Sequence, residues 1–444
     1  MKKVLLSAMV LASTATFAQA WTVQSTGFTE TSRGIRNIDI VNASTVWAIT
    51  YDGSDPTNDI QDFTRTTDGG NTWIPGSIPE ADGMMLTNVS AIDGMTAYVG
   101  GVSRDVQGFG GLFKTTDGGL TWEGLNEANY ISPDSFFNVV HFFNENVGVT
   151  QGDPVNGAYE LFRTTDAGAT WTAVTAPPPQ SGEYGYNGGN PYAGNSFWYV
   201  TNKGNIYRTT DMGMTFQKFN APVTDFSGTN AGGDLFFSDD NVGMLVRRLG
   251  SVSSPNFTMF RTFDGGATWD AGTPSTAPLG SGSFAYIPGT QVIVKCSADA
   301  AGPGSAYSED NGATWTIFGA AEQRGEVAFL NGTTGWSGGF NQDENTGGIF
   351  KFDGSFALGI NDVATVKKFT ASPNPTSGIL TLSSENATIS DVYVIDMLGK
   401  QVLSASFDAV NSASINMSNL NAGVYIVSAK DASGKVEVMR VVKN

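Results

Sequence analysis

Six copies of one short motif recur along the chain at nearly constant spacing. They read TTDGGNTW (66–73), TTDGGLTW (115–122), TTDAGATW (164–171), TTDMGMTF (209–216), TFDGGATW (262–269) and SEDNGATW (308–315). Their aspartates stand 49, 49, 45, 53 and 46 residues apart. A repeat of this length is typical of stacked supersecondary units, and the four-stranded blades of β-propellers repeat every ~40–50 residues. The spacing therefore predicts a repeated β architecture, but it names no activity.

Each residue type in the motif has a structural role in a tight turn. The aspartate is expected to accept hydrogen bonds from its own turn, and the glycine two residues later to supply a positive φ. The closing aromatic residue is expected to fill the gap between successive hairpins. Because a catalytic group is needed once and this motif is built six times, we assign these residues to structure: Asp68, Trp73, Asp117, Trp122, Asp166, Trp171, Asp211, Phe216, Asp264, Trp269, Asp310 and Trp315.

These copies resemble the Asp-box, or bacterial neuraminidase repeat, proteins. That group includes sialidases, xyloglucan-degrading enzymes, sortilin-type receptors and photosystem assembly factors. The resemblance covers about residues 21–356. It implies a β-propeller in which the boxes lie at the blade periphery, on the face away from the ligand-binding mouth.

Seven apolar runs are candidates for the innermost blade strands: 37–42, 88–93, 138–143, 194–200, 234–239, 283–288 and 326–331. The last blade ends in GGIFKFDGSF (347–356), a degenerate copy that we interpret with Asp353 at the aspartate position. Residues 21–23 resemble those that follow a box, so the N-terminal segment is expected to supply the outer strand of that blade. We predict a seven-bladed propeller, with six or eight blades as alternatives.

The two ends of the chain differ from the repeats. Residues 1–20 combine Lys2 and Lys3, an apolar stretch and Ala18-Gln19-Ala20, which is the pattern of a secretory signal peptide. No later segment has 18 consecutive apolar residues, so we expect no transmembrane segment. Residues 357–370 are interpreted as a linker. Alternating apolar residues with Gly, Asn and Pro punctuation in 371–444 predict a small β-sandwich.

The C-terminal segment also resembles a known family, the type A C-terminal sorting domain of the type IX secretion system of Bacteroidetes. The matching residues are Pro373, Asn374, Pro375, Gly378, Gly399, Lys400, Gly423 and Tyr425. The resemblance implies that the type IX machinery is a partner and that the chain is secreted to the extracellular space or the outer-membrane surface. A generic immunoglobulin-like binding module is the alternative.

Composition excludes some classes of ligand. The net charge of −18 argues against nucleic acid and anionic membranes. The single Cys296 cannot form an intrachain disulfide, and His141, the single histidine, is expected to be a packed strand residue. No His/Cys cluster with metal-ligand spacing occurs, and we expect no cofactor. The oxygen-rich loops 51–59, 238–240 and 341–345 are calcium candidates, but none has the spacing of a twelve-residue calcium loop, so solvated loops are favoured.

Propeller geometry places a set of charged and aromatic residues on the loop-rich face. The catalytic candidates are Asp52, Asp153, Asp234 and Glu326, and the ligand-binding candidates are Arg33, Arg36, Arg104, Tyr184, Tyr186, Arg247 and Arg324. We expect a module that binds an extracellular glycan or protein rather than an enzyme. The alternatives are a sialidase- or xyloglucanase-like glycoside hydrolase that uses these carboxylates, and an adhesin or scaffold.

Overall fold

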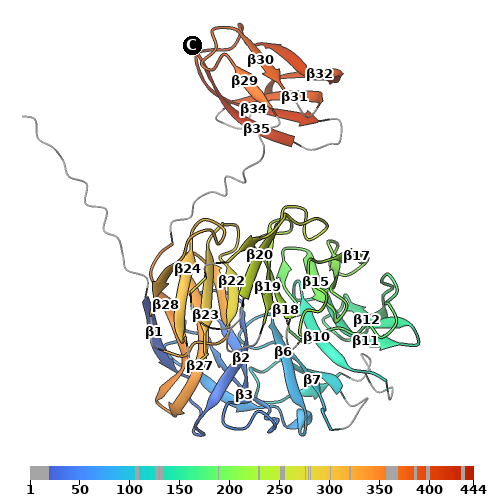
Figure 1. Ribbon diagram of the computed structural model, residues 1–444, viewed down its shortest axis with the longest axis vertical. Coiled ribbons are helices and arrows are strands. Elements are labelled where there is room, and N and C mark those ends of the chain that lie inside the picture. The colour runs from blue at the N-terminus through green and yellow to red at the C-terminus, as the bar shows by residue number, and fades with distance from the viewer. Residues whose placement is uncertain are drawn as a thin grey trace, which may run out of the picture. The chain divides into compact units, whose positions relative to one another are not determined.

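The computed structural model describes residues 20–356 and 369–444 apart from short segments. These segments are 106–109, 126–129, 131–133, 189, 229–230, 251–255, 276, 279, 281, 301, 320–321, 385–387, 397–400 and 432–435. The chain divides into two compact units, residues 1–360 and 361–444, which are described one at a time (Figure 1). Except for Ala20, the expected signal peptide lies outside the described residues, as does most of the expected linker.

Within its described residues, the first unit consists of seven groups of four antiparallel strands, called blades below. Blade 1 consists of β2 (Arg33–Ile40), β3 (Val46–Asp52), β4 (Asp62–Thr66) and β5 (Ile74–Ser77). Blade 2 consists of β6 (Met85–Ala91), β7 (Ala97–Val102), β8 (Gly110–Thr115) and β9 (Glu123–Gly124). Blade 3 consists of β10 (Phe137–Phe142), β11 (Gly148–Val155), β12 (Ala158–Thr164) and β13 (Thr172–Ala173). A short 3₁₀ turn, η1 (Pro79–Ala81), joins blades 1 and 2.

Blades 4 to 7 repeat this order. Blade 4 consists of β14 (Tyr192–Ala193), β15 (Ser196–Val200), β16 (Asn205–Thr209) and β17 (Gln217–Asn220), and blade 5 of β18 (Ala231–Phe237), β19 (Gly243–Leu249), β20 (Asn256–Thr262) and β21 (Thr273–Pro274). Blade 6 consists of β22 (Ser283–Tyr286), β23 (Ile293–Ser297), β24 (Gly304–Ser308) and β25 (Thr316–Phe318). Blade 7 consists of β26 (Val327–Asn331), β27 (Thr334–Asp343), β28 (Thr346–Asp353) and β1 (Ala20–Ser25).

The blades are arranged in a closed ring. The innermost strands β2, β6 and β10 pack in succession, as do β14, β18, β22, β26 and again β2. His141 on β10 stacks on Tyr192 of β14 with ring centroids 4.2 Å apart, which completes the circle. The prediction of an all-β propeller is therefore confirmed.

The N-terminal strand closes this ring, as the sequence predicted. β1 pairs antiparallel with β28, from Ala20 opposite Asp353 to Ser25 opposite Gly348, and the two strands lie side by side in Figure 1. The last blade thus combines the first and last strands of the unit, so its outer edge is paired rather than open.

Two details of the strand prediction were wrong. The run 194–200 was expected to be innermost in its blade, but Ser196–Val200 forms the second strand, and all five of its residues are buried. The innermost strand is the two-residue β14. Apolar content favoured the wrong segment because the second strand of a blade is covered on both faces.

The other error concerns the seventh blade. Trp336 pairs with Lys351 in blade 7, and Trp47 pairs with Arg65 in blade 1, so Lys351 and Arg65 occupy equivalent positions. The next residue is Phe352 in blade 7 and Thr66 in blade 1, so blade 7 lacks the hydroxyl that begins a box. Asp353 is therefore one position too early to act as the box aspartate.

The box turns form the hydrogen bonds that the sequence predicted. In the first box, Thr66 Oγ1 donates to Asp68 Oδ1 (2.8 Å), which also accepts from the backbone N–H of Thr72 (2.9 Å). The N–H of Gly70, whose φ is +87°, donates to Thr66 Oγ1 (2.9 Å). The same three bonds recur in the other five boxes. In the second box, hydrogen bonds from the Thr121 hydroxyl to Asp117 Oδ2 (2.6 Å) and from the Thr121 N–H to Asp117 Oδ1 (2.9 Å) lower the pKa of Asp117 to about 2.

A cation just before each box, where one is present, binds the box of the following blade. Arg65 Nε donates to the carbonyl of Gly118 (2.7 Å), and its guanidinium lies 5.5 Å from the centre of the Trp47 ring. Equivalent bonds are donated by Lys114, Arg163, Arg208 and Arg261. Lys351 Nζ donates to Gly69 O (2.8 Å) and so joins blade 7 to blade 1. These residues are structural, as their repetition indicated.

The second unit is a β-sandwich, as predicted. One sheet is β29 (Thr370–Ser372), β30 (Ile379–Ser383) and β33 (Ser412–Asn416), and the other is β32 (Gln401–Val410), β31 (Ile389–Asp396), β34 (Gly423–Asp431) and β35 (Val436–Lys443). Leu380, Val392 and Val427 are among the residues of its core.

The motif residues of this unit serve the sandwich. Asn374 donates to Arg440 O (2.8 Å) and accepts from the N–H of Val442 (2.9 Å), which ties the PNP segment to β35. Tyr425 donates to Asn421 O (2.9 Å). Gly399 and Lys400 lie outside the described residues.

Two glycine substitutions test how tightly successive blades pack. Both Gly213, in the fourth box, and Gly157, in a hairpin turn, have positive φ (+79° and +83°). A Cβ on Gly213 would lie 2.0 Å from Val149 Cγ1 of blade 3, whereas one on Gly157 would meet nothing within 4 Å. Gly157→Ala should cost ~1–2 kcal/mol for the left-handed conformation. Gly213→Ala should cost a further ~1–3 kcal/mol for overpacking.

Urea unfolding followed by tryptophan fluorescence measures this difference in the propeller alone, because all nine tryptophans lie between residues 21 and 336. Equal losses of stability in the two variants would contradict the packing between blades 3 and 4.

Candidate functional site

A cavity of about 620 Å³ occupies the centre of the ring. The innermost strands of all seven blades contribute to its wall, from β2 round to β26. Segment 187–192, which leads into β14, also lines it, except for the undescribed residue 189. This volume lies within the ~300–1,000 Å³ of typical ligand sites.

Polar side chains of the wall join neighbouring inner strands. Asn37 Oδ1 accepts from the N–H of Val89 (3.0 Å), and Asn88 Oδ1 from that of Val140 (3.0 Å). Two residues further along, Ser90 Oγ accepts from the N–H of Phe142 (2.9 Å). The paired residues advance together, so the inner strands run in the same direction. Their first residues therefore lie toward one mouth of the cavity and their last residues toward the other.

A hydrogen bond spans the cavity between non-neighbouring blades. The Tyr192 hydroxyl of blade 4 donates to Asp39 Oδ1 of blade 1 (3.0 Å), and Asp39 Oδ2 accepts from the N–H of Ala91 (2.6 Å). Burial raises the pKa of Asp39 to about 6, while both hydrogen bonds act in the opposite direction. Half of the Tyr192 surface (51 %) remains exposed, because the ring stands in the open cavity. Asp39 is near the end of β2, so this bridge crosses the cavity toward the mouth where the inner strands end.

Two further carboxylates line the cavity, and both lie farther from the ends of their inner strands than Asp39 does. Asp234, in β18, and Glu326, just before β26, both line the cavity. Burial raises the pKa of Asp234 to about 6, against the charges of Arg248 and Lys295. Burial, and secondarily the charge of Asp234, raises the pKa of Glu326 to about 7, although the Ser283 hydroxyl donates to Glu326 Oε2 (3.1 Å). Both carboxylates line the open cavity, which limits the cost of ionising them.

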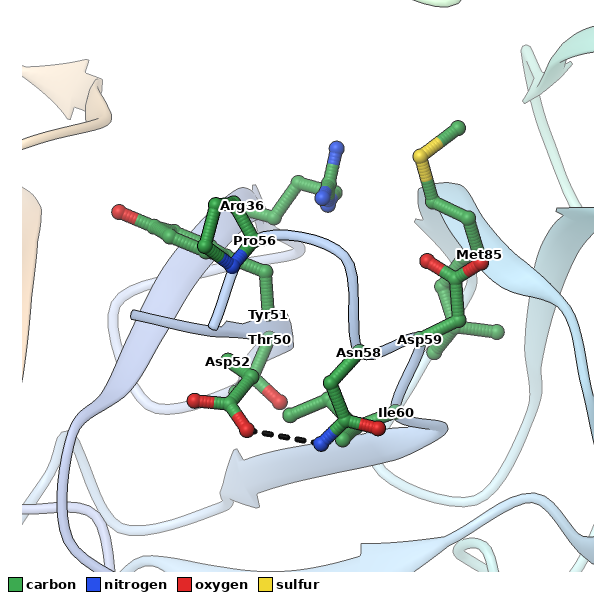
Figure 2. A pocket seen from close by; sticks show the side chains of 10 residues that line it. Arg36, Thr50, Tyr51, Asp52, Pro56, Asn58, Asp59, Ile60 and Met85 are labelled. Carbon is green, nitrogen blue, oxygen red and sulfur yellow. Dashed lines mark hydrogen bonds between the residues drawn. The ribbon is translucent and has the colours of Figure 1, made fainter. Parts of the chain in front are cut away.

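Arg36 is the cation of the cavity wall. It also borders a space of about 10 Å³, room for one water molecule, beside the loop that follows β3. Figure 2 shows its guanidinium pointing away from Asp52 and Asn58. Burial lowers the pKa of Arg36, but a guanidinium stays protonated in proteins, so the residue is charged.

Asp52 organises its own loop. Its Oδ1 accepts from the N–H and hydroxyl of Ser54 (2.9 and 2.6 Å), and its Oδ2 accepts from Asn58 Nδ2 (2.8 Å), the bond drawn in Figure 2. These bonds hold the pKa of Asp52 well below its usual range, with the Ser54 hydroxyl the largest cause. A carboxylate held ionised in this way cannot act as a general acid near neutral pH.

Two other predicted site regions lie outside the cavity wall. Asp153 accepts from Asn138 Nδ2 (2.8 Å) and from the N–H of Gly185 (2.9 Å), and burial raises its pKa to about 6. Tyr186 donates to Asp225 (2.7 Å), whereas Tyr184 is 43 % exposed. The Tyr184–Tyr186 segment thus turns a corner and presents one aromatic ring to solvent.

The remaining predicted arginines have partners within the fold. Arg33 pairs with Asp62 (2.9 Å), and Arg104 donates through Nε to Asp59 (2.9 Å). Arg247 lies 4.9 Å from the ring centre of Phe260. Arg324 is buried, pairs with Glu322 and lies over the ring of Phe350. None of these four lines the cavity.

Of the predicted catalytic and binding residues, the structure brings Arg36, Asp234 and Glu326 to the cavity wall. Asp39 and Tyr192 were not among the predicted site residues. Asp39 lies in a run interpreted as an inner strand, and Tyr192 lies just before another such run, so only the closure of the ring makes them neighbours. His141 is packed, as expected: it is 7 % exposed, and burial lowers its pKa to about 3.

No group of three or more His, Cys, Asp or Glu residues arranged to hold a metal occurs in the described part of the chain. The described residues also include no helix with the length and apolar character needed to cross a membrane.

The comparisons with known proteins define the class. Residues 371–444 match the secretion system C-terminal sorting domain, and residues 106–232 match photosynthesis system II assembly factor YCF48. The chain thus combines a β-propeller fold of the YCF48 and bacterial neuraminidase repeat type with a C-terminal segment that matches the sorting domain. The sorting domain marks it for type IX export to the cell surface or extracellular space, as predicted.

Solved structures agree with the fold. YCF48 from Cyanidioschyzon merolae is similar over 75 % of this chain and 99 % of its own, with 14 % identity and a TM-score of 0.51. YCF48 bound to D1 peptide (77 % and 98 % covered, 14 % identity, TM-score 0.49) and an ancestral GH74 enzyme (95 % and 54 %, 13 %, 0.47) are also similar. At this identity, the likeness to the Cyanidioschyzon merolae structure shows the fold alone. None of the curated proteins matches this chain.

The raised pKa of Glu326 predicts a pH-dependent stability. A carboxyl whose folded pKa lies above its unfolded value contributes stability below the unfolded pKa and loses it as pH rises through the folded one, here about 7. Thermal unfolding by tryptophan fluorescence should therefore show the Tm of Glu326→Gln rising relative to the native chain between pH 5 and 8. Glu80→Gln, at an exposed glutamate, is the control. A constant difference across this range would contradict the assignment.

Proposed function

We propose that the propeller is an extracellular binding module whose ligand, a glycan or protein, inserts part of its structure into the central cavity. The observation that carries this proposal is the cavity of about 620 Å³, with polar and charged side chains on its wall. The Tyr192–Asp39 bridge crosses it toward one mouth, so a ligand would enter from the other mouth.

The predicted carboxylates favour binding over hydrolysis. Both oxygens of Asp52 accept hydrogen bonds within its own loop. Asp153 does not line the cavity, and it accepts hydrogen bonds from Asn138 and Gly185. Of the predicted ligand-binding arginines, Arg36 lines the cavity, whereas Arg247 and Arg324 do not, so they form no cluster on its wall.

One observation supports glycoside hydrolysis as a second candidate. Asp234 and Glu326 share the cavity, and burial, with a smaller contribution from the charge of Asp234, raises the pKa of Glu326. A protonated Glu326 would donate to the glycosidic oxygen, while an ionised Asp234 would stabilise the positive charge that develops on the sugar.

Filling the cavity should abolish binding. Gly188 lines the wall, and a Cβ added to it would meet nothing within 4 Å, so Gly188→Trp would place a bulky ring in the open space there. Ala169→Trp is the control for an added tryptophan, because Ala169 is an exposed box position where other blades carry Leu120 and Met214. On glycan and peptide arrays, the native chain and Ala169→Trp should bind the same ligands, and Gly188→Trp should lose them. Retention of binding by a folded Gly188→Trp would contradict the use of the cavity.

Hydrolysis assays on the ligands found in this way separate the two candidates. We expect no product. Turnover that Glu326→Gln reduces by at least about a hundredfold, the lower range for general acid catalysis, would establish the enzyme instead.

A further inference from the structure

Three ionisable groups on the cavity wall, Arg36, Asp234 and Glu326, have few hydrogen bonds and no ion pair among the described residues. The Arg36 guanidinium lies 5.5 Å from the centre of the Tyr51 ring, but it makes no hydrogen bond or ion pair with any described residue, and its Nε is buried. By contrast, Arg33 and Arg104 are both paired with carboxylates. A guanidinium has five N–H donors, so an unpaired one on a cavity wall is suited to an acidic or carbonyl group.

The acidic side of the cavity is also incompletely compensated. The Asp234 carboxylate accepts no hydrogen bond from the described residues, and Glu326 accepts one, from Ser283. Lys295, one of the two cations that act on Asp234, is fully buried outside the cavity wall. Its ammonium donates to Pro278 O (3.1 Å) and lies over the rings of Phe257 and Phe284. Even with Lys295 and Arg248 acting on it, the pKa of Asp234 stays raised.

The wall includes another buried polar atom without a hydrogen-bond partner among the described residues, on His141. His141 is more than nine-tenths buried, and its Nε2 has no hydrogen-bond partner among the described residues. Because burial keeps it neutral, it does not balance the carboxylates. The rings of Phe236, Phe284 and Tyr192 give the same cavity apolar surface that could pack against an aliphatic side chain.

We propose, resting on the binding function above, that the ligand is a peptide segment with a basic side chain. The Lys or Arg cation would lie between Asp234 and Glu326, and Arg36 would receive a carboxylate or carbonyl group of the same segment. A neutral glycan would leave charges of both signs without partners, whereas a peptide carries both signs on one chain. The charges on the cavity wall therefore favour a protein ligand over a glycan.

Synthetic peptides test the proposal directly. The probe is a set of fluorescent, acetylated and amidated Gly-rich hexapeptides whose two central positions run over all amino acids, with chitosan oligomers as a second cationic probe. Fluorescence anisotropy should show tightest binding to peptides with Lys or Arg. Asp234→Asn and Glu326→Gln should each weaken it about tenfold, the value of one charge-assisted hydrogen bond. Glu80→Gln should change nothing.

Charge reversal separates recognition from loss of folding. Asp234→Lys should shift the preference from basic to acidic peptides, and Arg36→Gln should keep the basic preference while losing any acidic one. A preference of the native chain for neutral peptides would overturn the proposal. A preference for basic peptides that stays unchanged in the Asp234→Asn/Glu326→Gln double variant would also overturn it. Binding of chitosan or neutral glycans without peptides would overturn it and leave the binding function intact. Failure of every peptide and glycan to bind would reject both.

Discussion

The ring is held together by contacts between the third strand of one blade and the box turn of the next. A sheet of four strands satisfies its own backbone internally, but the carbonyl groups of its box turns have no strand partner. An arginine or lysine from the preceding blade fills this need, as Arg65 does for Gly118. The aromatic residue opposite it, such as Trp47, covers the cation and keeps it extended. Lys351 and Gly69 repeat the contact where the chain ends meet.

This arrangement separates structure from function within each blade. The boxes and their cations occupy the third and fourth strands, and the innermost strands are joined by side chains such as Asn37 and Asn88. Residues on the inner strands that are not used in this way are free to differ among blades. Asp234, Ser283 and Glu326 occur on three consecutive blades, so the acidic part of the cavity is confined to one side.

The Tyr192–Asp39 hydrogen bond makes the two mouths of the cavity different. It lies toward the mouth where inner strands end, and Asp234 and Glu326 lie farther from that mouth. A ligand would then enter end-on rather than thread the ring. Export by the sorting domain places this mouth outside the cell, where peptides and glycans are both available.

Much of the fold followed from local chemistry. The box motif specifies a turn through contacts within a few residues, and its repetition at blade length implied a propeller and its closure by β1. The sorting domain was recognisable for the same reason, since PNP and the turn glycines are local signals. The seventh blade was misread at Asp353 because a one-residue deletion preserves the letters of the motif while changing the register.

The site depended on contacts between residues far apart in sequence. Loop position alone proposed Asp52 and Asp153, but hydrogen bonds to Asn58, Asn138 and Gly185 commit both to structure. Asp39 and Tyr192 are 153 residues apart and become partners only when the ring closes. The sequence by itself thus determined the repeating unit and the export signal, because both are encoded by near neighbours. Only the tertiary structure decided which charges share one cavity, because that depends on how seven separate strands converge.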